Sequence, residues 1–184
     1  MKKRTLTMTA ILAVIFFSRA AAQDATMLTA YARAVRYFNP ALGTDGALAL
    51  ASATIAQANR RHLDARLLVA IVAVESSWNP QAVSTAGARG LGQLMPQTAE
   101  GLGIDANDPR ENLAGAAAHL QALLARYAGR DPGTQATLAI AAYNAGSAAV
   151  DYYGGIPPYA ETRAYVGRVL TLWRRLSGEP APAR

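Results

Sequence analysis

Apolar residues recur at helical spacing along most of the chain, in alanine- and leucine-rich stretches that glycine and proline separate. No sustained stretch alternates apolar and polar residues in the way that predicts a half-buried strand. The pattern therefore predicts an all-α domain with little or no sheet and no internal repeats. Helices are expected over residues 26–37, 47–61, 64–78, 97–102, 111–127, 134–144 and 161–176.

The N-terminal segment has the order of a secretory signal peptide. It starts with basic residues, continues through an apolar stretch that is densest over residues 10–17, and ends in three alanines before Gln23. We therefore expect residues 1–22 to be cleaved after Ala22 and the protein to be exported. An uncleaved membrane anchor is the alternative, but the apolar stretch is short for a span and Arg19 interrupts it.

Composition and charge narrow the chemistry available to this fold. The chain has no cysteine and only two histidines, which excludes disulfides and a thiol nucleophile and argues against a zinc hydrolase. The formal charge of +6 falls to +2 without residues 1–22, because that segment carries four basic residues and no acid. Such a small excess does not indicate a nucleic-acid surface, although it suits a weakly anionic polymer. We expect no metal and no nucleic-acid partner.

One carboxylate stands out because it lies in an apolar helix. Leu68, Ile71, Val72 and Glu75 follow helical spacing, so the Glu75 side chain projects from the apolar face. Burial disfavours the ionised form and raises the pKa of a carboxyl group toward the range that suits a general acid. A structural glutamate paired with an arginine or a helix N-terminus is the alternative. Position alone does not separate these two roles.

Two later segments carry candidate ligand-binding side chains. The loop over residues 84–96 contains three glycines, so its backbone can approach a ligand closely. Gln93 in this loop offers both a donor and an acceptor, which suits sugar hydroxyl and acetamido groups. Tyr143 can pack on a sugar ring while the adjacent Asn144 hydrogen-bonds to it. Taken singly, these segments are also typical of a turn and of a helix C-cap.

Four blocks in this order resemble the soluble lytic murein transglycosylase domain, which is related to goose-type lysozyme. The blocks are Glu75-Ser76, GLGQLMP from Gly90 with Thr98-Ala99, AYNAG over residues 142–146, and PPYAETRAYV over residues 157–166. The resemblance covers about residues 60–176 and implies a lysozyme-like helical domain. One departure is visible, since Gly92 replaces the methionine usual in the second block.

The resemblance also implies how the chain is organised. Residues 1–22 would be the signal peptide, 23–59 the N-terminal helices, 60–176 the catalytic domain and 177–184 a flexible tail. The implied location is the periplasm or cell envelope, without a stable membrane anchor. The implied partner is the glycan strand of peptidoglycan, and some members of the family open the wall for secretion or conjugation machinery.

The family further implies a reaction that needs one acidic side chain. Glu75 would be the sole acid/base, cleaving the β-1,4 bond between N-acetylmuramic acid and N-acetylglucosamine and leaving a 1,6-anhydromuramic acid end. No cofactor is implied. The tyrosine of the fourth block, Tyr165, is expected to hold or polarise Glu75 through its hydroxyl. The positions that match substrate-binding residues are Ser84, Gln93, Met95, Tyr143, Asn144 and Tyr165.

Two other functions stay open on the sequence. A goose-type hydrolase would add water and would need a second carboxylate, for which Asp105 and Asp108 are the candidates. An inactive wall-binding scaffold of a secretion or conjugation apparatus would keep the substrate surface without the reaction. The intact Glu75-Ser76 pair argues against the scaffold, because an ionisable group on an apolar face is costly to retain.

Overall fold

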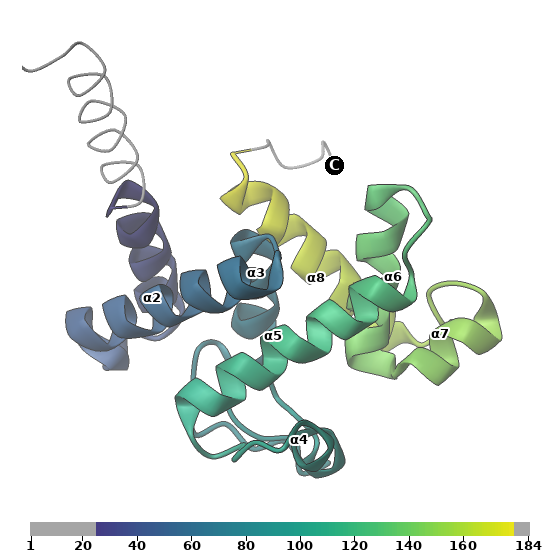
Figure 1. Ribbon diagram of the computed structural model, residues 1–184, viewed down its shortest axis with the longest axis horizontal. Coiled ribbons are helices and arrows are strands. Elements are labelled where there is room, and N and C mark those ends of the chain that lie inside the picture. The colour runs from purple at the N-terminus through teal and green to yellow at the C-terminus, as the bar shows by residue number, and fades with distance from the viewer. Residues whose placement is uncertain (1–24, 179–184) are drawn as a thin grey trace, which may run out of the picture.

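The computed structural model describes residues 25–178, which form helices joined by loops, with no strand in this range (Figure 1). The β-type pairing within these residues consists of two isolated β-bridges, Val83–Arg89 and Arg89–Leu94. The predicted all-α fold is therefore confirmed. After a helix over residues 25–38, the elements are η1 (Pro40–Leu42), α2 (Gly43–Arg61), α3 (Ala65–Ser76), α4 (Pro96–Leu102), α5 (Pro109–Arg126), α6 (Pro132–Ala145), α7 (Ser147–Tyr153) and α8 (Ala160–Leu176).

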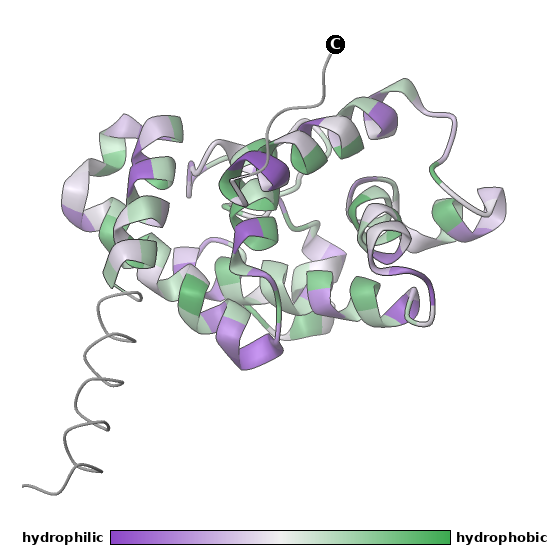
Figure 2. Cartoon of the chain, turned by 90° about the horizontal axis from the view of Figure 1, so that it is seen from above, coloured by the Kyte–Doolittle hydropathy of each residue, from purple (hydrophilic) through white to green (hydrophobic). Residues whose placement is uncertain are grey.

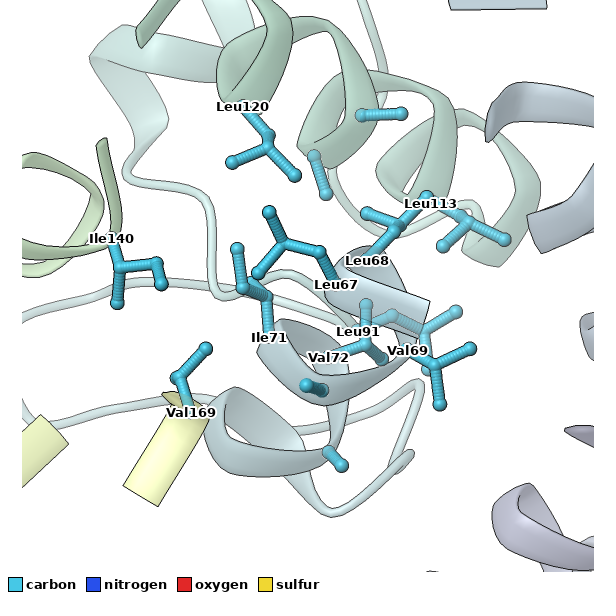
Figure 3. Close-up of a cluster of buried hydrophobic side chains, with 14 of the residues drawn as sticks. Leu67, Leu68, Val69, Ile71, Val72, Leu91, Leu113, Leu120, Ile140 and Val169 are labelled. Carbon is cyan, nitrogen blue, oxygen red and sulfur yellow. The ribbon is translucent and has the colours of Figure 1, made fainter. Parts of the chain in front are cut away.

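Helix α3 lies at the centre of the hydrophobic core. All its residues from Leu67 to Ala73 are buried, and the helix packs against α2, α5 and α8. A helix that is apolar almost all round belongs in the interior, which explains why this stretch lacks a polar face. Figure 3 shows its side chains surrounded by apolar side chains of other elements. The residues labelled there are, from α3, Leu67, Leu68, Val69, Ile71 and Val72 and, from other elements, Leu91, Leu113, Leu120, Ile140 and Val169.

Different local features begin and end α3. At its N-terminus the Asp64 carboxylate accepts from the Arg66 backbone N–H, as an N-cap does. The helix was predicted to continue to Trp78 but ends at Ser76, because Ser77 and Trp78 both have positive φ. The Trp78 side chain is completely buried and anchors the chain just after this turn. Glu75 consequently lies in the last turn of a helix that is fixed at both ends.

Three further differences from the expected elements have local causes. Helix α2 begins at Gly43 instead of residue 47, and η1 and α7 were not predicted. Helix α7 has seven residues between two glycines and no side-chain N-cap bond, so its periodic signal is too short to recognise. The predicted signal peptide over residues 1–22 and most of the predicted tail lie outside the described residues.

The helices place α2 and α7 at opposite ends of the long axis, with α3, α5, α6 and α8 between them (Figures 1 and 2). In Figure 2 most helices carry both hydrophobic and hydrophilic residues, as amphipathic helices around a shared core do. The loop after α3 and helix α4 form a separate lobe beside the core helices (Figure 1). No helix within residues 25–178 combines the length and apolarity needed to cross a membrane.

Candidate active site

A carboxylate and a phenol that are distant in sequence meet at the end of α3. The Tyr165 hydroxyl, on α8, donates a hydrogen bond to Glu75 Oε1 at 2.6 Å. Tyr165 is buried, and burial raises its pKa well above the ordinary value, so the phenol keeps its proton and remains a donor. The structure therefore joins the two residues that the family resemblance had linked, across 90 positions of sequence.

Burial dominates the acidity of this carboxylate. It raises the pKa of Glu75 from 4.5 to about 7, even though the Tyr165 hydrogen bond and the Arg168 charge both favour the ionised form. Glu161, on the same helix as these two residues, acts in the opposite direction and favours the protonated form. Near neutral pH the group therefore exists in both protonation states, as a residue must that first donates and then accepts a proton.

The other aromatic of the predicted site braces the glycine-rich loop. The Tyr143 hydroxyl donates to the Gly92 carbonyl at 2.9 Å, and its ring lies 5.1 Å from that of His119, centroid to centroid. A Cβ at position 92 would lie 2.5 Å from Ala116 Cβ and 2.9 Å from the Tyr143 hydroxyl. The glycine that departs from the family pattern is thus required by packing, because no side chain fits here without a shift of α5 or Tyr143.

Asn112, on α5, stabilises the same loop through hydrogen bonds. Its fully buried amide donates to the carbonyls of Arg89 and Ala106, at 2.8 and 2.9 Å, and accepts from the Gly92 N–H at 2.8 Å. Ala106 lies outside this loop, so Ser76 adds a third bond to the loop through its hydroxyl, which donates to the Leu91 carbonyl at 2.8 Å. These bonds fasten the loop to α5 and to the helix that carries the carboxylate. The sequence interpretation gave neither side chain a role, because the backbone groups to which they bond belong to segments that are distant in sequence.

The predicted loop residues Gln93 and Ser84 form hydrogen bonds with the backbone of their own loop. Gln93 has a positive φ, and its Nε2 donates to the carbonyls of Ala82 and Gly90. The Ser84 hydroxyl accepts from the backbone of Ala88, within the same loop. The amide nitrogen of Gln93 is therefore directed into the loop. Its amide oxygen accepts no hydrogen bond from the loop. Met95, which precedes α4, is exposed.

Asn144 lies at the end of α6 and connects that helix to α8. Its Oδ1 accepts from the hydroxyl of Thr162, a buried residue one turn before Tyr165, at 2.8 Å. This bond directs the Asn144 oxygen toward α8 and fixes the orientation of the amide. Tyr143 and Asn144 are adjacent in sequence, yet one braces the glycine-rich loop and the other braces α8.

The two candidate second carboxylates are occupied elsewhere. Asp105 accepts from the backbone and side chain of Asn107, and Asp108 caps α5 through bonds from two backbone N–H groups. Both are exposed. Within the described residues no three histidine, cysteine or acidic side chains are grouped so that they could hold a metal ion. Of these three carboxylates, Glu75 is thus the half-buried one, and the nearby charge of Glu161 raises its pKa further.

Comparison with known proteins supplies the family. The family model described as the transglycosylase SLT domain matches residues 52–165. The chain is 37% identical over 131 residues to a transglycosylase of Enterobacteria phage PRD1, a match that covers 70% of this chain and 45% of the phage protein. It is 45% identical over 86 residues to the membrane-bound lytic murein transglycosylase F of Serratia proteamaculans, covering 46% of this chain and 18% of that one.

Solved structures resemble the same region. The lytic transglycosylase Slt of Pseudomonas aeruginosa, in a glutamate-to-glutamine variant described as inactive, matches with a TM-score of 0.56 and 29% identity over 71% of this chain and 25% of that chain. The 70 kDa soluble lytic transglycosylase of Escherichia coli matches with a TM-score of 0.57 and 26% identity, over 70% and 24% of the two chains. The chain spans less than half the length of the relatives named here. With more than half of its own residues matched by the family model, it belongs to the transglycosylase SLT domain family.

Proposed function

We propose that this protein is a lytic transglycosylase of peptidoglycan, with Glu75 as its sole acid/base. The observation that carries the proposal is the half-buried carboxylate of Glu75, which is hydrogen-bonded to Tyr165 and whose pKa of about 7 leaves it partly protonated at neutral pH. Family membership supports the substrate class, because the Serratia relative is described as acting on murein. The inactive glutamate-to-glutamine variant of the Pseudomonas structure supports a reaction that depends on one glutamate.

The proposed reaction conserves every atom of the glycan. Protonated Glu75 donates its proton to the glycosidic oxygen, and the bond from that oxygen to C1 of N-acetylmuramic acid breaks. The 2-acetamido carbonyl of the same sugar stabilises C1 as positive charge develops, so no second carboxylate is needed. Ionised Glu75 then takes the proton of the 6-hydroxyl, and O6 bonds to C1 to close the 1,6-anhydro ring. Glu75 finishes protonated and ready for another cycle.

Tyr165 acts in this scheme as a positioning residue. Its hydrogen bond occupies Oε1, which leaves Oε2 of Glu75 to face the glycosidic oxygen. The same bond stabilises the ionised form between the two proton transfers, while burial favours the protonated form before and after them. The balance of these two effects keeps the pKa near neutrality, where both transfers are feasible.

The hydrolase and scaffold alternatives fit the site less well. A hydrolase needs a second carboxylate to activate water, and the bonds of Asp105 and Asp108 commit both to loop and helix capping. An inactive scaffold in a secretion or conjugation apparatus gains nothing from a half-buried glutamate whose surroundings favour its protonated form. We further propose export to the periplasm or cell envelope, which the order of residues 1–22 supports and a murein substrate requires.

The experiment compares Glu75→Gln with the matched variant Glu100→Gln, whose glutamate is exposed on α4. Purified peptidoglycan is incubated with each protein, and soluble fragments and pelleted protein are measured. Wild type and Glu100→Gln are expected to release fragments, whereas Glu75→Gln pellets with the wall and releases none. Undiminished release by Glu75→Gln would refute the role of Glu75.

A further inference from the structure

Three tyrosines form a connected aromatic surface at the start of α8. Tyr152 and Tyr153 end α7, and Tyr159 directly precedes α8; their exposed fractions are 83, 45 and 44%. The Tyr153 ring meets the Tyr152 ring edge-on, with centroids 4.9 Å apart, and the Tyr159 ring edge-on at 5.8 Å. We call these three residues the tyrosine surface.

Packing of the fold does not account for this surface. A single exposed aromatic is ordinary, but three rings connected through Tyr153 make an aromatic patch of the kind that marks binding sites. The segment between Tyr153 and Tyr159 adds the exposed Ile156. The rings also lie on a fixed support, because Asp151 of α7 pairs with Arg126 and accepts from the Tyr127 hydroxyl at the end of α5. The tyrosine surface is therefore held in place, although its own rings face solvent.

The position of the surface relates it to Glu75. Tyr159 is the N-cap of α8, and Tyr165 lies six residues further, in the second turn of the same helix. Six residues of helix span about 9 Å, roughly the length of two sugar rings. Asn144 bonds to Thr162, which lies in the first turn of α8 between Tyr159 and Tyr165 in sequence. Figure 1 shows α7 reaching outward from this point, at the end of the molecule away from α2.

We propose that the tyrosine surface binds the glycan strand of peptidoglycan beyond the sugars that react. This proposal rests on the proposed function, since it extends the same substrate along α8. Tyrosine suits the task because its ring can cover the apolar face of a pyranose while its hydroxyl hydrogen-bonds to a sugar hydroxyl or acetamido group. The three side chains are neutral, which matches sugar rings better than charged stem peptides.

The consequence is a preference for long strands. Contacts made away from the reacting sugars are equally strong before and during the reaction, so they lower KM without raising kcat. A strand long enough to reach from Glu75 to Tyr152 gains these contacts, and a disaccharide bound at Glu75 does not. Length dependence of binding therefore separates this surface from the reacting site.

The test uses the Glu75→Gln protein, which binds without turnover under the proposed function. Its affinity is measured for glycan strands freed of stem peptides and for the disaccharide di-N-acetylchitobiose. Adding Tyr152→Ala and Tyr153→Ala is expected to weaken strand binding about tenfold, a loss typical of two aromatic contacts, and to leave disaccharide binding unchanged. The matched control adds Tyr37→Ala, which removes a tyrosine 81% exposed on the helix 25–38, and is expected to change neither affinity.

Each other outcome overturns the proposal in a recognisable way. Equal strand affinity in the double variant and the Tyr37→Ala control would show that the surface does not contact glycan, while leaving the proposed function intact. Equal weakening for strand and disaccharide would show that the surface acts on the reacting site. Failure of the Glu75→Gln parent to bind any strand would refute the proposed function itself. If the double variant unfolds, Tyr152→Ala alone, at the most exposed of the three rings, is expected to weaken strand binding about threefold.

Discussion

Replacing Tyr165 by Phe removes one hydrogen bond and leaves the ring in place. The lost bond runs from the phenol to Glu75 Oε1 at 2.6 Å, and it stabilises the ionised carboxylate. A hydrogen bond to a charged group contributes about 1.5 to 3 kcal/mol, and each pKa unit corresponds to about 1.4 kcal/mol. Because the bond favours the ionised form, its loss raises the pKa of Glu75 by about one to two units, from about 7 to about 8 or 9.

The pH dependence of turnover reports this shift. The reaction starts with protonated Glu75, so the rate falls as pH rises through the pKa of that group. Wild type should lose activity above about pH 7, and Tyr165→Phe should hold its remaining activity to about pH 8 or 9. The assay measures initial release of soluble peptidoglycan fragments from pH 4 to 10.

Tyr127→Phe is the matched control for this prediction. It removes a phenol that also donates to a carboxylate, that of Asp151, but at the end of α5. Its alkaline limit should coincide with that of the wild type. The reasoning would be wrong if the Tyr165→Phe profile kept the wild-type alkaline limit, since the bond would then not influence the ionisation of Glu75.

Three further predictions follow from the buried groups. Between pH 4.5 and 7 the folded state holds a proton on Glu75 that the unfolded chain releases, so wild type should lose up to about 3 kcal/mol relative to Glu75→Gln as pH rises from 4 to 8, measured by denaturant unfolding. Gly92→Ala should destabilise the fold by about 1 to 3 kcal/mol through overpacking, and adding Ala116→Gly should recover part of that loss in a double-mutant cycle. Asn112→Ala should cost about 2 kcal/mol or more, because it leaves the buried Gly92 N–H and the Ala106 carbonyl unpaired, whereas the exposed Asn107→Ala should cost far less.

Each of these has a contrary result. A constant stability difference between wild type and Glu75→Gln across pH would mean that the carboxylate is not desolvated. Additive effects of Gly92→Ala and Ala116→Gly would mean that the two positions do not compete for the same space. A loss for Asn112→Ala no greater than that for Asn107→Ala would mean that the loop does not depend on the buried amide.

Local patterns predicted the helices and the carboxylate because both leave a signal over a few residues. The apolar stretch of α3, its N-cap Asp64 and the prolines that begin α5 and α6 can each be recognised from one or two helical turns of sequence. The carboxylate of Glu75 stands out because it interrupts such a stretch. Contacts between distant positions leave no such signal. Tyr165 was linked to Glu75 only through the family blocks, and no sequence pattern indicated that Gly92 packs against Ala116.

Buried polar side chains were the least predictable part of the site. Asn112 occupies an ordinary helical position in sequence, and only the fold brings the carbonyls of Arg89 and Ala106 to its amide. Gln93 was predicted to bind sugar through both ends of its amide, whereas the nitrogen bonds to its own loop. Helix α7 was missed for another reason, since seven residues between glycines do not establish a period.

Isotope incorporation tests the central claim most directly, because the proposed reaction consumes no water. Purified peptidoglycan is digested by the wild-type protein in water enriched with oxygen-18, and the masses of the new sugar ends are measured. Intramolecular ring closure predicts 1,6-anhydromuramic acid ends that carry no heavy oxygen and are lighter than hydrolysis products by one water. Reducing ends labelled with oxygen-18 at C1 would contradict the account, since a water molecule and a second activating group would then take the place of the 6-hydroxyl.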